Sequence, residues 1–406
     1  MKRIPVGDFR IGEEEKRAVN EVLDSGRITE GAKVREFEKA LASYVGTRHA
    51  VAVNSGTSAL IAGITAMTYI DEIAVSPGTK VITTPLTYVA DSNAVVVTGF
   101  EPVYVDVDRE TFLITPENVK EHLENVDDVS QYSFILPVHL MGHPCDMDGM
   151  RKVAKQYGLQ VLEDSAQAHG TVYKGKKTGA LSLLSVFSFY IAHNIQAGEL
   201  GAVATNRGDI ARLVRKIKAN GRMCDCAVCR RAQGKCRQMM RHDREDDFDP
   251  RFTHDSIGYN FKAMEFQAAL AVTQLRRADW IFERRQQNVK YLNEELEEFS
   301  DLVQLPKFSH TISYFAYPIV IRNPLKLPRK ELRRRLEEKG IETRPLFGCI
   351  PTQQPAYAQM REKYLGKLPN AEYLGKNAFY IGCHQYLTQE DMEYTAETIK
   401  GILRRL

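Results

Sequence analysis

The 406-residue sequence has no apolar run approaching the roughly 18 residues that a membrane-spanning helix needs. Its first 17 residues are rich in charge and lack the apolar segment of a secretory signal. Fifty-five Lys and Arg against 52 Asp and Glu leave a net charge of +3, too balanced to indicate a nucleic acid or an anionic membrane as a global partner. Internal repeats and low-complexity tracts are also missing. These absences exclude membrane, fibrous and disordered proteins and predict a cytoplasmic one.

What is present is the composition of a large soluble protein. Hydrophobic residues make up 43% and charged residues 26% of the chain. At about 100–200 residues per domain, this length predicts two or three domains, large enough to bury a core without disulfides.

Cysteine is the one unusual feature. The chain has seven, of which four fall close together: Cys224, Cys226, Cys229 and Cys236. In a reducing compartment such a group is more often a metal site than a set of disulfides.

Seven short runs rich in apolar residues read as strands, and helical patterns lie between several of them. The runs are VAVN (51–54), KVITTP (80–85), PVYVDV (102–107), SFILPV (133–138), LQVLED (159–164), SVFSFY (185–190) and GAVATN (201–206). Such alternation predicts an α/β fold with a seven-stranded, mostly parallel sheet. The near-continuous hydrophobicity predicts helices on both faces of that sheet.

The alternation of predicted strands and helices ends after residue 220, where a Cys- and Arg-rich stretch begins. We expect a large α/β domain with its N-terminal segment over 1–220 and a Cys- and Arg-rich insert over 221–262. A long helix followed by a small C-terminal α+β domain is expected over 263–406.

Polar residues follow several of the predicted strands, where ligands collect in open α/β sheets. Ser55-Gly56-Thr57 opens a helix and either cradles a phosphate or simply caps the helix. Asp164 either pairs with a protonated heterocyclic nitrogen or caps the following turn. Tyr88 either stacks on a flat ring or packs in the core, and Ser188 ends the sixth strand.

In combination these motifs are far more specific. The order SGT, PLTYVADSNAV, PVYVDVD, PVHLMGHPCDMD, EDSAQAHG, FSFYIAHN, GYNFKAMEFQAA and RPLF resembles the DegT/DnrJ/StrS family, the sugar-aminotransferase branch of fold-type I vitamin B6 enzymes. The resemblance runs from about Gly12 to the C-terminus and implies a homodimer with its sites at the subunit interface.

The resemblance also implies roles for individual residues. They are Gly56, Thr57 and Ser188 for the cofactor phosphate, Tyr88 for stacking on the pyridine ring, Asp164 for the ring nitrogen, Gln167 for the ring hydroxyl, Asn260 for the phosphate of the neighbouring subunit's cofactor and Arg344 for the sugar-nucleotide pocket.

One residue departs from the family's aminotransferases, which place a Schiff-base lysine five residues after the phosphate-binding serine. Here that position holds His193, which cannot form the bond but can act as a general acid or base. The same replacement marks the family's sugar 3-dehydratases. We therefore expect noncovalent pyridoxamine phosphate, or pyridoxal phosphate in its other form. The expected reaction removes the C3 hydroxyl of a nucleotide-linked 4-keto-6-deoxyhexose, with His193 as the catalytic base.

The four clustered cysteines suit either an iron–sulfur cluster or a Cys₄ zinc site. A dehydratase sub-branch acting on CDP-linked 4-keto-6-deoxyglucose carries an iron–sulfur cluster in this stretch and works with a reductase. We therefore expect such a cluster and a flavin- or ferredoxin-type reductase as partner. That sub-branch also draws one ligand from well upstream, where this chain has Ala166. Zinc and unliganded thiols thus stay open.

Three other functions are compatible with the sequence. The chain is a sugar aminotransferase whose lysine was replaced, or a dehydratase regenerated by glutamate without redox chemistry. Alternatively it is a noncatalytic sugar-nucleotide-binding protein with structural zinc.

Overall fold

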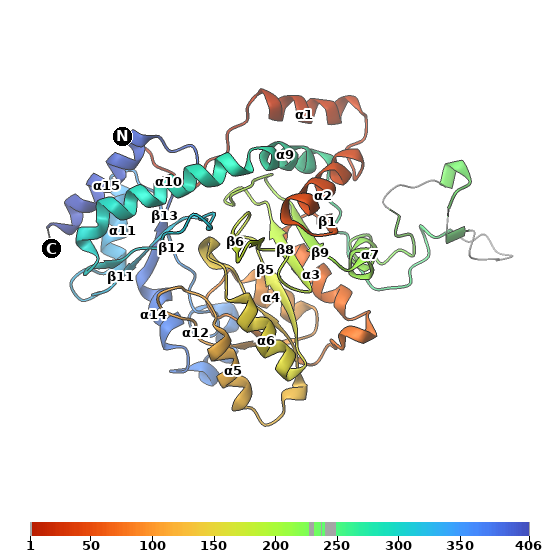
Figure 1. Cartoon of the computed structure of the whole chain (residues 1–406), viewed down its shortest axis with the longest axis horizontal. Coiled ribbons are helices and arrows are strands. Elements are labelled where there is room, and N and C mark those ends of the chain that lie inside the picture. The colour runs from red at the N-terminus through yellow and green to blue at the C-terminus, as the bar shows by residue number, and fades with distance from the viewer. Residues whose placement is uncertain (1, 227–230, 237, 240–248, 406) are drawn as a thin grey trace.

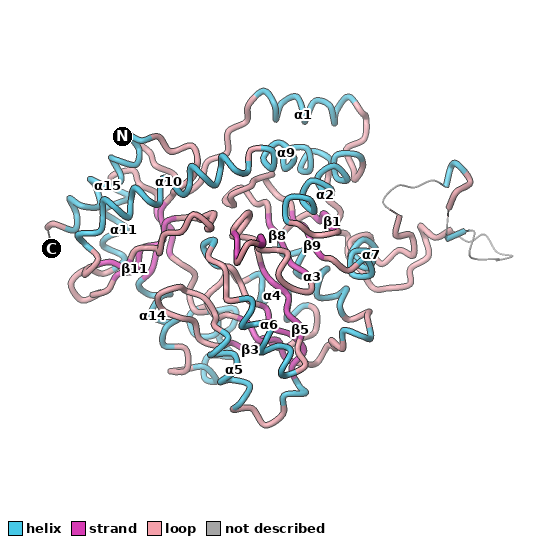
Figure 2. The backbone as a smooth tube through the Cα atoms, viewed as in Figure 1, coloured by secondary structure: helices cyan, strands magenta, loops and turns pink. Residues whose placement is uncertain are grey.

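A computed structural model describes residues 2–226, 231–236, 238–239 and 249–405 of the chain. Figure 1 shows a large sheet wrapped by helices and a second, smaller sheet close to both chain ends. The tube in Figure 2 shows how long loops join many of these elements and gather between the two sheets.

The large sheet contains all seven strands that the sequence predicts. In spatial order they are β1 (His49–Val53), β9 (Gly201–Thr205), β8 (Leu184–Ser188), β5 (Gln160–Asp164), β4 (Tyr132–Leu136), β2 (Lys80–Thr83) and β3 (Glu101–Tyr104). The strands from β8 to β3 run parallel, whereas β9 is antiparallel to both of its neighbours. The predicted seven-stranded, mostly parallel α/β fold is therefore confirmed.

Helices cover both faces of this sheet. Successive strand residues such as Val81 and Ile82 belong to different apolar clusters, because their side chains point to opposite faces of the sheet. One face packs against α3 (Gly56–Met67), α4 (Ala90–Val97) and α7 (Gly208–Ile217), and the other against α2 (Ala32–Val45), α5 (Pro116–Glu124), α6 (Met147–Tyr157) and α9 (Glu265–Arg276). The sheet is thus buried on both faces, as its apolar strands require.

The smaller sheet is antiparallel and lies near the C-terminus. Its order is β10 (Val303–Gln304), β11 (Tyr317–Ile321), β13 (Ala378–Ile381) and β12 (Thr343–Pro345). An apolar cluster joins it to α10 (Ala278–Leu296), α11 (Arg329–Glu338) and α15 (Gln389–Leu403). Ile4 belongs to the same cluster and pairs with Ile341, so the N-terminal segment packs on this sheet.

The remaining elements are short or peripheral. They are α1 (Glu13–Asp24), the hairpin β6 (Val172–Tyr173) and β7 (Lys176–Lys177), α12 (Ile350–Gln353), α13 (Arg361–Tyr364) and α14 (Pro369–Asn377), and short segments of 3-10 helix. Within the described residues, none of the helices combines the length and apolar character needed to cross a bilayer.

A buried carboxylate ties α9 to the start of α2. The N-cap residue of α2, Gly31, has no side chain with which to satisfy the free N–H groups of the first turn. Glu265 supplies that function from α9: its Oε1 accepts from Gly31 and Val34, and its Oε2 from Lys33, each at 2.8 Å. Residues more than 230 positions apart are thereby joined through charge-assisted hydrogen bonds.

This cap makes a specific prediction about stability. Glu265→Gln removes the charge and turns one accepting oxygen into a donor that faces N–H groups. We expect a loss of roughly 1–3 kcal/mol in the free energy of unfolding, measured by denaturant titration. The matched control is Glu121→Gln on the exposed side of α5, for which we expect less than about 0.5 kcal/mol. Equal effects for the two variants would show that the cap contributes nothing special.

Candidate active site

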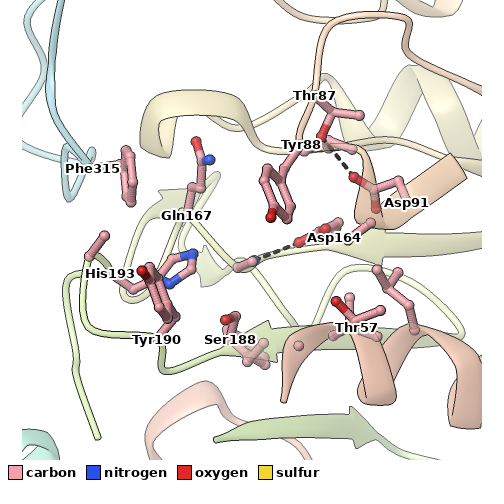
Figure 3. Close-up of a pocket in the computed structure, with 18 of the residues that line it drawn as sticks. Thr57, Thr87, Tyr88, Asp91, Asp164, Gln167, Ser188, Tyr190, His193 and Phe315 are labelled. Atoms are coloured by element: carbon pink, nitrogen blue, oxygen red, sulfur yellow. Dashed lines mark hydrogen bonds between the residues drawn. The ribbon is translucent and has the colours of Figure 1, made fainter. Parts of the chain in front are cut away.

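A cavity of about 440 Å³ opens where β5 and β8 end and α3 begins. This is the edge of a parallel sheet at which ligands bind in α/β proteins. The predicted site residues that line it are Gly56, Thr57, Tyr88, Asp164, Gln167, Ser188, His193 and Arg344. Figure 3 shows Tyr88, Asp164, Gln167 and Ser188 around a common space, with His193 on one side and Thr57 at the start of α3 on the other.

The amino end of α3 forms one corner of the cavity. Ser55 caps the helix by accepting from the N–H of Ser58 at 3.1 Å. The N–H groups that precede Ser58 in the first turn have no carbonyl partner within the helix. A Cβ on Gly56 would lie 2.6 Å from the Cβ of Ser188, so only glycine lets this serine approach. A hydroxyl group and free N–H groups together suit a phosphate.

Asp164 lies in the wall of the cavity at the last residue of β5. Its backbone N–H donates to the carbonyl of Pro137 at 2.9 Å, and its carbonyl accepts from the N–H of His139 at 3.0 Å. Its Oδ1 accepts from the N–H of Ala166 at 2.7 Å. The residue is 7% exposed, and burial raises the pKa of its carboxyl group. A ligand that brings a positive charge would therefore be strongly favoured here.

Gln167 and Tyr88 supply an oriented amide and an open ring. The Oε1 of Gln167 accepts from the N–H of Met141 at 2.9 Å, so its NH₂ group is the end left to donate to a ligand. Tyr88 is 61% exposed although it lines the cavity, and its ring meets that of Phe347 edge-on at 6.0 Å. One face of the Tyr88 ring is thus available for stacking on a flat ligand.

His193 is half-buried, with aromatic rings around it. The ring centroids of Phe315, His169 and Tyr190 lie 5.5, 6.1 and 6.2 Å from that of His193. Burial, reinforced by the charge of Arg285, lowers the pKa of His193 to about 4. Its imidazole is therefore neutral near pH 7 and can accept a proton.

The chemistry of the lining agrees with a cofactor that is held noncovalently. Among the described residues that line the cavity there is no lysine. An anion-binding corner, a buried carboxylate, an oriented amide and an open aromatic ring are all present. These groups fit the phosphate, ring nitrogen, hydroxyl group and flat face of a pyridoxal-type cofactor.

Arg344 reaches the cavity from the small sheet. It lies on β12 and pairs with Glu342, whose Oε1 is 3.0 Å from its Nη2. The backbone N–H of Val6 donates to the other oxygen of Glu342 at 3.0 Å, so this corner also involves the N-terminal segment.

Asn260 and the cysteines lie apart from the cavity lining. Asn260 is exposed. Cys224 and Cys226 bring their Sγ atoms to 3.1 Å, whereas Cys229 falls outside the described residues. In the part of the chain that is described, no group of three His, Cys, Asp or Glu side chains is arranged to hold a metal. The four-cysteine site that the sequence predicts is therefore not assembled by the described cysteines.

Several lining residues were missed by sequence reasoning. They are Thr87, Asp91, Tyr190 and Phe315, of which Asp91 is the most unexpected because it is a buried acid. The sequence did offer a signal for Asp91: it is a carboxylate three residues after Tyr88, within a run of mostly small and apolar residues.

Comparisons with known proteins agree with this geometry. A family described as the DegT/DnrJ/EryC1/StrS aminotransferase family matches residues 10–400. The lipopolysaccharide biosynthesis protein RfbH of Salmonella typhimurium is 31% identical over 396 residues, which cover 96% of this chain and 90% of the relative. A dTDP-4-dehydro-2,6-dideoxy-D-glucose 3-dehydratase of Saccharopolyspora spinosa is 31% identical over 395 residues, covering 96% and 84%.

A solved structure shares the fold over the whole chain. The GDP-4-keto-6-deoxy-D-mannose-3-dehydratase of E. coli with bound hydrated PLP superposes with a TM-score of 0.86 at 25% identity. The match covers 98% of this chain and 100% of that one.

The environment of His193 predicts its protonation state. In a histidine-labelled sample the signal that disappears in His193→Asn should titrate well below the usual value near 6.5, with the imidazole neutral from about pH 6 to 8. NMR titration of the ring resonances measures this. A midpoint at or above 6.5 would mean that burial and Arg285 do not control the ring.

Proposed function

Because the chain belongs to the DegT/DnrJ/EryC1/StrS aminotransferase family, we propose that it is a vitamin B6-dependent 3-dehydratase of nucleotide-linked sugars. It would bind pyridoxamine phosphate without a covalent bond and remove the C3 hydroxyl of a 4-keto-6-deoxyhexose. The observation that carries this proposal is that His193 lines a cavity whose described lining offers no lysine.

The relatives support this reaction class. One is named as a 3-dehydratase of a dTDP-linked keto sugar, and the E. coli structure is a GDP-linked keto-sugar 3-dehydratase with bound hydrated PLP. The nucleotide differs between these two relatives, so the proposal extends to a nucleotide-linked sugar and leaves the base unassigned. Transamination is the second candidate, because the family is named for aminotransferases. The described lining, however, lacks the lysine amine that would hold the cofactor in such an enzyme.

The cofactor would be held by the groups that line the cavity. Gly56, Thr57 and Ser188 are proposed to bind its phosphate, and Asp164 its ring nitrogen. Gln167 would donate to the ring hydroxyl and Tyr88 would stack on the ring. When bound, pyridoxamine phosphate supplies a primary amine and an electron-accepting ring.

His193 would move the proton that the reaction requires. Its ring lines the cavity, where it can exchange a proton with a bound ligand. The rings of Phe315 and Tyr190 lie beside it, with centroids 5.5 and 6.2 Å from that of His193. A positioned general base of this kind contributes about 10²–10⁴-fold to a rate.

Two further residues would act on the substrate and across the subunit boundary. Arg344 at the edge of the cavity is proposed to contact the anionic sugar nucleotide. Asn260 is exposed and outside the cavity of its own chain, and Ile257, three residues earlier, is 78% exposed. A homodimer in which Asn260 reaches the partner's cofactor phosphate would account for both features.

The cysteines of the insert are proposed to hold a metal centre, with an iron–sulfur cluster preferred and zinc as the alternative. The support is their placement within residues 224–236 and the 3.1 Å contact between Cys224 and Cys226. Because the described cysteines do not assemble a complete site, the reaction above is written without any step through a cluster. A reductase partner is proposed only together with iron.

Metal analysis tests the cysteine proposal. Anaerobically purified protein should contain iron with matching acid-labile sulfide, and Cys224→Ser/Cys226→Ser should lose both. The matched control is Cys145→Ser, because Cys145 is buried and lies well before the insert in the sequence. Zinc without sulfide would indicate a structural zinc site. Protein that contains neither iron nor zinc would refute the proposed metal centre.

Replacement of His193 tests the dehydratase directly. His193→Asn should keep its affinity for pyridoxamine phosphate and lose about 10²–10⁴-fold in C3–O cleavage, because only the proton acceptor is removed. His193→Lys should acquire an amine that attaches to pyridoxal phosphate and remains attached after borohydride reduction. Mass spectrometry of protein and sugar measures both. Unchanged cleavage by His193→Asn would refute the role of the histidine.

A further inference from the structure

Asp91 is a second buried acid in the cofactor cavity. It lies on α4, is 2% exposed and lines the cavity beside Asp164 (Figure 3). Its Oδ2 accepts from the hydroxyl group of Thr87 at 2.7 Å. Its Oδ1 is buried, and no N–H or O–H group of the described residues donates to it. Asp164, which is 7% exposed, is the other buried acid that lines this cavity.

Two adjacent buried carboxyl groups cannot both be ionised without a cation. No ion pair of the described residues includes Asp91 or Asp164. Behind Asp164, Glu163 and His139 pair with each other at 2.9 Å, and on the cavity side the lining includes Arg344, Glu199 and His193. Like charges in a desolvated site raise the pKa of one partner until it keeps its proton.

The hydrogen bonds decide which carboxyl group keeps the proton. Asp164 accepts from the main-chain N–H of Ala166, which favours its ionised form, whereas Asp91 accepts only from the Thr87 hydroxyl. Burial and the Asp164 charge raise the pKa of Asp91 well above its usual value. For Asp164, the hydrogen bond from the N–H of Ala166 opposes the effect of burial, which raises the pKa of its carboxyl group.

We propose that Asp91 is a protonated carboxylic acid that donates a hydrogen bond to Asp164 and positions that carboxylate for the ring nitrogen of the cofactor. The pair then carries one negative charge, which matches the single positive charge of a protonated pyridine ring. Asp91 is thus a positioning residue that acts through Asp164. The inference rests on the proposed role of Asp164 in cofactor binding.

The cofactor-free enzyme tests the proton itself. The infrared spectrum near neutral pH should contain the C=O stretch of a buried carboxylic acid, and this band should be absent in Asp91→Asn. If folding raises the pKa of this carboxyl group above its usual value near 4, the protein must take up a proton when it folds at a higher pH. The free energy of unfolding therefore falls as the pH rises. The melting temperature of Asp91→Asn should therefore exceed that of the wild type at pH 8, and the difference should shrink towards pH 4–5. No band, or identical pH dependence of the two proteins, would overturn the proposal.

Binding of pyridoxal phosphate and pyridoxamine phosphate tests the positioning. Asp91→Asn keeps a hydrogen-bond donor of the same shape and should bind both near wild-type affinity. Asp91→Leu removes the donor and should weaken both by about tenfold or more. The matched control is Ser92→Ala on the same helix, whose hydroxyl bonds Tyr104 and does not line the cavity.

The outcomes separate this inference from the proposed function. Equal loss in Asp91→Asn and Asp91→Leu would mean that an ionised Asp91 is required and would overturn the inference, as would wild-type affinity in both. Unchanged cofactor affinity and absorption spectrum in Asp164→Asn would instead refute the proposed role of Asp164. The infrared band would still report on Asp91 in that case.

Discussion

The rest of the site depends on one carboxylate that is buried at the end of a strand. Asp164 is fixed through its backbone to Pro137 and His139 on the neighbouring chain segment, and its Oδ1 is fixed by Ala166. A buried negative charge without a cation is costly, and in this cavity a bound protonated heterocycle would offset the cost. The helix start at Gly56 then sets where an attached phosphate can lie. The charge at one end of the cavity and the N–H groups at the other define the length and polarity of the molecule that fits between them.

His193 determines what such a molecule could be used for. The residue follows Ser188 by five positions, and the fold brings both to the cavity. A neutral imidazole beside Phe315 and Tyr190 can exchange a proton but cannot hold the cofactor covalently. The fold is that of the family, and in the function proposed here the change of one side chain would shift the chemistry from amino transfer towards elimination.

Much of the fold and of the site follows from local sequence. The seven strands were predictable because each is a short apolar run between turn residues. Gly56, Tyr88, Asp164 and Ser188 were candidates because parallel strands deliver their carboxyl ends to one edge, whereas Gln167, His193 and Arg344 were expected only from the resemblance to the family. Asp91 was not, because its pairing with Asp164 depends on strand order, which places β4 beside both β2 and β5. The buried Arg285, which donates to the carbonyls of Tyr314 and Phe315 and lowers the pKa of His193, is equally nonlocal. For the cysteines, close spacing in sequence did not translate into a common site among the described residues.

The central claim is that this chain cleaves the C3–O bond of a nucleotide-linked 4-keto sugar instead of aminating its ketone. The measurement that tests it most directly is mass spectrometry of the sugar after reaction of wild-type protein, loaded with one equivalent of pyridoxamine phosphate, with GDP-, dTDP- and CDP-linked 4-keto-6-deoxyhexoses. The account predicts a sugar that has lost its C3 oxygen. A product that keeps this oxygen and carries an amino group at C4 would contradict it.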